Sequence, residues 1–86
     1  MRYTVVAEPQ AQKQLTRLWT KSRSAQRREI TRASAVIDTQ LRDDPATKAK
    51  SQPEGLFIID VPPLRAYFGV SEPDRLVTIT DYRWIG

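Results

Sequence analysis

The chain has 86 residues, with 14 Lys or Arg against 10 Asp or Glu, and it contains neither cysteine nor histidine. This length fits one domain over residues 1–86, and the missing residue types exclude disulfides, thiol nucleophiles and triads built on histidine. No apolar run reaches the roughly 18 residues that span a bilayer, and no signal-peptide pattern opens the chain. We therefore expect a soluble cytoplasmic domain with no membrane segment, metal or cofactor.

Positive charge is concentrated in the first part of the chain. Residues 1–32 hold eight Lys or Arg against Glu8 and Glu29, whereas residues 33–86 hold six basic and eight acidic residues. A basic region of this kind suits a nucleic-acid backbone, a ribosome surface or an acidic protein partner. A solvated helix surface is the alternative explanation.

A strand and a helix are predicted first. Residues 2–7 alternate around Tyr3 and Val5, which is typical of a strand. Pro9 is suited to the first position of a helix. The apolar positions of this helix fall on one face and are Ala11, Leu15, Leu18 and Trp19.

A second helix is predicted from about residue 25 to residue 41, with Ser22 or Ser24 as its N-cap. The apolar positions that line its buried face are Ile30, Ala33, Ile37 and Leu41. Arg28 and Arg32 share one side of this helix, with Arg27 next to them. We predict that these three arginines contact RNA phosphates, which would add affinity without sequence preference.

Residues 42–55 form the longest irregular stretch, and they contain Lys48 and Lys50. A connection of this length is often functional. The two lysines are candidate phosphate ligands, and a solvated surface loop is the alternative.

Three strands are predicted in the rest of the chain, at residues 56–60, 64–70 and 75–83, with Pro62 and Pro63 in the first turn. The order is β-α-α-β-β-β. It predicts an α+β domain in which a helical hairpin packs on a mainly antiparallel four-stranded sheet.

Arg65 is the unusual residue of the third predicted strand, which is otherwise apolar. Because a guanidinium is costly to desolvate without a partner, Arg65 either faces an anion or pairs with an acidic side chain, for which the candidates are Asp60, Glu72 and Asp81. Tyr67 and Phe68 point to opposite faces, so one of them is core. Later in the chain Tyr82 and Trp84 share a strand face, and Arg83 points the other way.

These segments in this order resemble the RelE/ParE superfamily of bacterial toxins. The segments that carry the resemblance are Tyr3-Thr4-Val5, the two apolar helix faces, Gly55-Leu56-Phe57, Leu64-Arg65-Ala66-Tyr67-Phe68-Gly69-Val70 and Arg75-Leu76-Val77-Thr78-Ile79. The resemblance covers nearly the whole chain. It implies a toxin of a type II toxin-antitoxin system, of the kind also described as a plasmid stabilisation protein.

The resemblance implies one of two targets. Members of the RelE branch cut messenger RNA in the ribosomal A site without a metal, through attack by the ribose 2′-hydroxyl. Members of the ParE branch inhibit DNA gyrase. In both branches a cognate antitoxin silences the toxin. Arg65 falls on the position that holds the scissile phosphate in the RelE branch, a task that suits a fixed guanidinium.

The chain also departs from the best-known ribonucleases of the family. Their second strand carries lysines that flank the phosphate, whereas residues 56–60 contain no basic residue. Where a His-Tyr ending would align, this chain has Trp84 and Ile85.

We therefore expect a ribosome-dependent endoribonuclease with an incomplete catalytic set. Its predicted catalytic residues are Arg65, Arg83 and Tyr82, with Lys48 or Lys50 as charge partners. The alternatives are a gyrase inhibitor and a non-toxic member of the family that only binds its antitoxin.

Overall fold

The computed structural model describes residues 2–45, 50–51 and 55–86, and these form two helices and five strands. In chain order the elements are β1 (Thr4–Ala7), α1 (Pro9–Thr20), α2 (Ser24–Asp43), β2 (Lys50–Ser51), β3 (Phe57–Val61), β4 (Leu64–Ser71) and β5 (Leu76–Trp84). The predicted order β-α-α-β-β-β is confirmed. The difference is β2, a two-residue strand within the stretch that was expected to be irregular.

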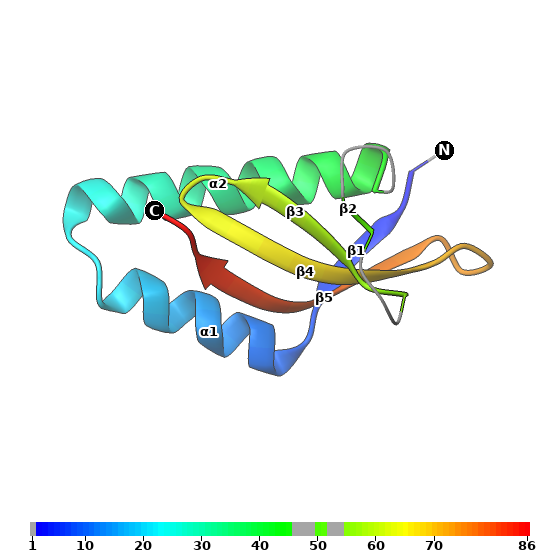
Figure 1. Cartoon of the computed structure of the whole chain (residues 1–86), viewed down its shortest axis with the longest axis horizontal. Coiled ribbons are helices and arrows are strands. Elements are labelled where there is room, and N and C mark those ends of the chain that lie inside the picture. The colour runs from blue at the N-terminus through cyan, green and yellow to red at the C-terminus, as the bar shows by residue number, and fades with distance from the viewer. Residues whose placement is uncertain (1, 46–49, 52–54) are drawn as a thin grey trace.

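All five strands belong to one sheet in the order β1-β5-β4-β3-β2. β1 runs parallel to β5, and the other three pairs are antiparallel. The mainly antiparallel sheet is therefore confirmed, with β2 as a short addition at one edge. The N-terminal strand thus lies beside the C-terminal strand, and β4 lies in the middle of the sheet (Figure 1).

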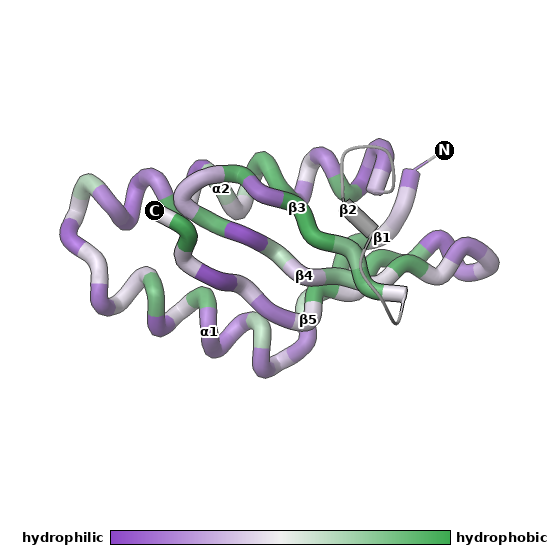
Figure 2. Tube along the Cα trace, viewed as in Figure 1, coloured by the Kyte–Doolittle hydropathy of each residue, from purple (hydrophilic) through white to green (hydrophobic). Residues whose placement is uncertain are grey.

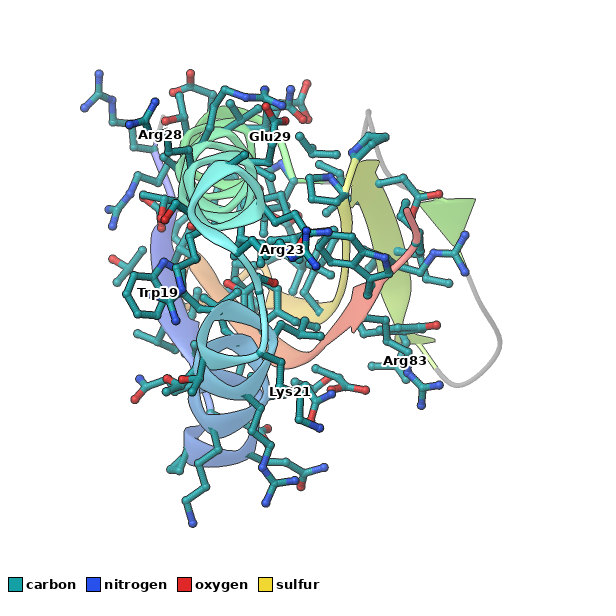
Figure 3. The ribbon with its side chains drawn as sticks, turned by 90° about the vertical axis from the view of Figure 1, so that its left-hand side faces the viewer. Trp19, Lys21, Arg23, Arg28, Glu29 and Arg83 are labelled. Atoms are coloured by element: carbon teal, nitrogen blue, oxygen red, sulfur yellow. The ribbon has the colours of Figure 1, made fainter. Side chains whose placement is uncertain are left out.

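Both helices pack against one face of the sheet, as predicted. α1 contacts β5 and β1, and α2 contacts β3, β1 and β4. Figure 3 views the helices nearly end-on, with the curved sheet beside them. The buried side chains between the two layers come from α1, α2 and the three long strands, and they are Ala11, Ile30, Ala33, Ile37, Leu41, Ile59, Leu64, Ala66, Phe68, Val77, Ile79 and Tyr82.

The start of α2 differs from the prediction by one residue. Arg23 is the N-cap, and its backbone N–H donates to Oε1 of Gln26 at 3.1 Å. Ser24 is the first helical residue, and Ser22 donates its hydroxyl to the carbonyl of Leu18 at 2.6 Å. Because Ser22 binds the end of α1, it is not available to cap α2, and the prediction of Ser22 or Ser24 as N-cap is wrong.

A β-bulge interrupts the pairing of β4 with β5. Tyr67 is the partner of Asp81 and Phe68 is the partner of Ile79, so Thr80 is an extra residue on β5. Its hydroxyl donates to the carbonyl of Tyr67 at 3.3 Å. A bulge shifts the alternation of side chains by one position, and for this reason both Ile79 and Tyr82 face the helices although they are three residues apart.

Candidate functional site

Three charged side chains form a row across the sheet face that the helices leave open. Asp60 on β3 is the register partner of Arg65 on β4, and Arg65 is the register partner of Arg83 on β5. Alternation along β4 places Arg65 on the face opposite the buried Leu64 and Ala66. Figure 2 shows hydrophilic segments on the neighbouring strands β3, β4 and β5, separated along each strand by neutral or apolar positions.

Arg65 and Asp60 form an ion pair with two hydrogen bonds. Nε of Arg65 donates to Oδ1 of Asp60 at 2.7 Å, and Nη2 donates to Oδ2 at 3.1 Å. The two side chains are 36% and 37% exposed. The carboxylate of Asp60, and after it the hydroxyl of Tyr67, raises the pKa of Arg65 above its already high usual value. Arg65 is therefore a permanently charged group with a fixed orientation.

Arg83 is held more loosely on the same face. Its Nε donates to Oδ2 of Asp81 at 3.3 Å, and its side chain is 66% exposed. Its guanidinium carbon lies 5.8 Å from the centre of the Tyr67 ring, within the range of a weak cation–π contact. Arg65 and Arg83 are thus brought together on one face of the sheet.

Tyr67 is a candidate residue that the sequence analysis did not include. Phe68 is fully buried, and its ring stacks on Phe57 at 5.6 Å between ring centres. Tyr67 consequently faces the other way, opposite Asp81 and beside both Arg65 and Arg83. The signal was present in the sequence, because residues two apart on a strand share a face, and Tyr67 follows Arg65 by two.

Tyr82 does not join the two arginines. It is 5% exposed and lies opposite Ala66 on the helix side of the sheet. Burial, with a smaller effect from Asp38 on α2, raises the pKa of its hydroxyl. This placement keeps Tyr82 away from a substrate on the open face, and the assignment of Tyr82 as a catalytic residue is corrected here to a core residue.

The three arginines of α2 lie away from this face. Arg27 donates from Nε to the carbonyl of Trp19 at 3.0 Å and from Nη2 to that of Thr20 at 3.2 Å, and its guanidinium lies 4.2 Å from the Trp19 ring centre. Arg32 pairs with Glu29 at 2.9 Å. In Figure 3, Trp19 and Arg28 project from the helix side of the molecule and Arg83 from the sheet side. The two predicted basic sets therefore do not form one site.

The predicted lysines are described only in part. Lys48 lies outside the described residues. The backbone of Lys50 belongs to β2 and pairs with Ile58, whereas its side chain is also outside the described part.

An open hollow of about 440 Å³ adjoins Arg83 on the sheet face. It lies between the start of α1 and strands β4 and β5, and its lining residues are Glu8, Gln10, Leu56, Tyr67, Thr80, Asp81 and Arg83. The hollow extends the open face beyond the two arginines. Its lining includes an aromatic ring, hydrogen-bond donors and hydrogen-bond acceptors.

Residues 2–45, 50–51 and 55–86 contain neither a cluster of metal ligands nor a membrane-spanning helix. In this part of the chain no three carboxylate side chains gather closely enough to hold a metal ion. Neither of the helices there has the length and apolar character needed to cross a membrane.

The chain is similar to known proteins in its structure, whereas its sequence alone matches none of those compared. No protein-family model matches the sequence, and no curated protein sequence matches it either. Among solved structures, the RelBE2 toxin-antitoxin complex of Mycobacterium tuberculosis is 18% identical, with 98% of this chain and 99% of that chain covered and a TM-score of 0.79.

Two further solved structures are also similar to this chain. The isolated RelE toxin of E. coli is 17% identical, covers 98% of this chain and 85% of its own, and has a TM-score of 0.64. The archaeal RelE-RelB complex of Pyrococcus horikoshii is 16% identical, covers 100% and 98%, and has a TM-score of 0.60. At these identities the likeness concerns the fold, and the resemblance inferred from the sequence is confirmed at that level: this chain has the fold of the RelE toxins.

Proposed function

We propose that this chain is the toxin of a type II toxin-antitoxin pair and that it cleaves messenger RNA on the ribosome without a metal. The observation that carries the proposal is the pair of arginines on the open sheet face, Arg65 and Arg83, opposite each other in register. Two neighbouring guanidiniums on a rigid sheet suit a phosphodiester, whose two free oxygens share one negative charge. The RelE-type fold adds support, since the solved structures with this fold include toxins and toxin-antitoxin complexes.

In the proposed reaction the ribose 2′-hydroxyl attacks the adjacent phosphorus, and the bond to the 5′-oxygen of the next nucleotide breaks. Arg65 and Arg83 stabilise the charge that develops on the non-bridging oxygens. Tyr67, beside Arg65 on β4, supplies the hydroxyl that protonates the leaving 5′-oxygen. The proton of the 2′-hydroxyl passes to water, and water returns a proton to Tyr67. The products are a cyclic phosphate and a free 5′-hydroxyl, and no cofactor is consumed.

The proposed partners follow from this assignment. Messenger RNA and the ribosome are the substrate complex in the cytoplasm, and an antitoxin protein keeps the toxin silent until it is released. Three of the solved structures with this fold are toxin-antitoxin complexes, which supports an antitoxin for this chain as well.

The test is induced expression followed by primer extension on a translated message. Wild type is expected to arrest growth and to cut within codons at the A site. Arg65→Ala and Arg83→Ala should each slow cleavage by about 10²–10³, the usual effect of removing one charge-stabilising donor. Arg42→Ala is the matched control, because Arg42 is also an ion-paired surface arginine, at 2.8 Å from Asp38 on α2. Uncut messages with wild type, or equal cleavage by Arg65→Ala, would exclude the proposal.

A gyrase-directed toxin is the second candidate. It is favoured by the ion pairs that Arg65 and Arg83 each form with an aspartate, because these pairs offset part of the positive charge that a phosphate would meet. In this case purified protein would inhibit DNA supercoiling and leave messages intact. A non-toxic chain that binds only its antitoxin would show neither effect.

A further inference from the structure

The carboxylate of Asp60 occupies one edge of the Arg65 guanidinium. A guanidinium has two edges that can bind an anion through two parallel N–H groups: the side edge, formed by Nε and Nη2, and the end edge, formed by Nη1 and Nη2. Both hydrogen bonds to Asp60 use the side edge, from Nε and from Nη2. Neither bond uses Nη1, so the ion pair with Asp60 leaves the end edge able to bind a second anion. The hydroxyl of Tyr67 also interacts with Arg65, from the same face of the sheet.

Arg65 needs such a restraint because of its other neighbour. Arg83 is its register partner on β5, and like charges directly opposite each other on a sheet repel. Without a carboxylate on the β3 side, the long side chain of Arg65 would turn away and sample several rotamers. Asp60 attracts it from the side away from Arg83 and fixes the plane of the guanidinium.

The restraint on Arg65 is stronger than that on Arg83. Arg83 makes one hydrogen bond to Asp81 at 3.3 Å, and its side chain is 66% exposed. Arg65 makes two, the shorter at 2.7 Å, and its side chain is 36% exposed. The two arginines are thus not equivalent: one is fixed and the other is free to adjust to a ligand.

We propose that Asp60 is a positioning residue for Arg65. It holds the side edge of the guanidinium so that the end edge is presented to a phosphodiester, while Arg83 closes on the same phosphate. The proposal rests on the proposed function for its kinetic consequence. Its structural consequence, a guanidinium fixed by Asp60, does not depend on cleavage.

Asp60 has opposite effects on affinity and on rate. Its negative charge repels RNA, so its removal raises affinity for RNA by about two- to fivefold, the scale of one exposed ion pair. Its removal also frees the guanidinium, and misplacement of a group that must meet the transition state lowers the rate by about tenfold to a hundredfold. A residue with only a structural role would not separate the two quantities in this way.

The experiment compares Asp60→Asn with Asp38→Asn. Asp38 makes the same kind of ion pair, with Arg42 at 2.8 Å on α2, and the control removes the same charge. Three quantities are measured for wild type and both variants: the cleavage rate on translating ribosomes, the affinity for a short fluorescent single-stranded RNA, and the Nε–Hε NMR signal of Arg65, assigned from its loss in Arg65→Lys.

The expected result is slower cleavage by Asp60→Asn together with tighter RNA binding and an Arg65 signal that is shifted or broadened. Asp38→Asn should match wild type in rate and in the Arg65 signal. The proposal is overturned if Asp60→Asn cleaves as fast as wild type, or if its losses of rate and of affinity are equal.

The failure of the proposed function has a different signature. If wild type itself does not cleave messages, the ribonuclease assignment fails, and the NMR signal during titration with dimethyl phosphate decides the role of Asp60. A sharp, ligand-responsive Arg65 signal in wild type that is lost in Asp60→Asn supports the positioning role. Identical signals in the two proteins refute it.

Discussion

Substitutions at Tyr82 and Tyr67 should separate a core tyrosine from one on the open face. Tyr82 is 5% exposed, opposite Ala66 and under the helices. Tyr67 is half-buried on the other side of the sheet, where Arg83 lies 5.8 Å from its ring centre. Alanine at each position tests packing, and phenylalanine tests the hydroxyl alone.

The two alanine variants should differ most in stability. Removing a buried aromatic ring costs about 3–5 kcal/mol, and a domain of 86 residues has a total free energy of unfolding of about 4–13 kcal/mol at the usual value per residue. Tyr82→Ala therefore removes a large share of the total. Tyr67→Ala should cost about 1 kcal/mol, because one side of the ring already faces solvent.

The two phenylalanine variants should differ in activity in the opposite sense. Tyr67→Phe removes the proposed proton donor and should slow cleavage by about 10²-fold. Tyr82→Phe keeps the ring in the core, so its cleavage rate should stay within about twofold of wild type and its stability within about 1 kcal/mol.

Urea titration supplies the free energies of unfolding, with the fluorescence of Trp19 and Trp84 as the probe and circular dichroism as a check on two-state behaviour. Primer extension on a translated message supplies the rates. The reasoning would be refuted by a Tyr82→Ala protein as stable as wild type. It would equally be refuted if Tyr82→Phe abolished cleavage while Tyr67→Phe left it unchanged.

Two further predictions concern stability. Arg27→Ala should lower the free energy of unfolding by about 1–2 kcal/mol, because Arg27 binds two end carbonyls of α1 and covers the Trp19 ring. Arg28→Ala, at an exposed position, is the control. Equal urea midpoints for Arg27→Ala and Arg28→Ala would contradict the prediction. The second is alkaline: the folded pKa of Tyr82 is raised, so its contribution to stability is complete below an unfolded pKa of about 10 and is lost as pH rises through the folded pKa. Stability measured by urea titration should thus fall less steeply above about pH 10 in Tyr82→Phe, and parallel curves for the two proteins would oppose this.

The helices were predictable because their signals are local. The 3.6-residue spacing from Ala11 to Leu18 and from Ile30 to Leu41 marks which face is buried, and Pro9 fixes the start of α1. Trp19, which was expected on the same face of α1, is instead 42% exposed. Their ends were less certain, since Ser22 had two possible hydrogen-bond partners and the structure uses the one on α1. A choice of this kind depends on where the first helix ends in space.

Part of the candidate site was also predictable. A single arginine in an apolar strand identifies Arg65 as unusual, and alternation places Arg83 on the face opposite Tyr82. The sequence left three possible acidic partners for Arg65, Asp60, Glu72 and Asp81, because the choice among them depends on the register between strands. The arginines of α2 were predicted to contact RNA as well, yet Arg28 projects from the helix side of the molecule (Figure 3) and Arg27 binds the end of α1.

By itself, the sequence determined the order of the elements, the buried face of each helix and the presence of a charged residue on the central strand. All of these follow from spacings within one element.

The tertiary structure decided which side chains of those elements come together. The register of β3, β4 and β5 places Asp60, Arg65 and Arg83 in one row. The bulge at Thr80 shifts the alternation of β5 within the strand, so that Ile79 and Tyr82 both enter the core. Strand register and bulges depend on contacts between strands, so the alternation of side chains along one strand does not predict them.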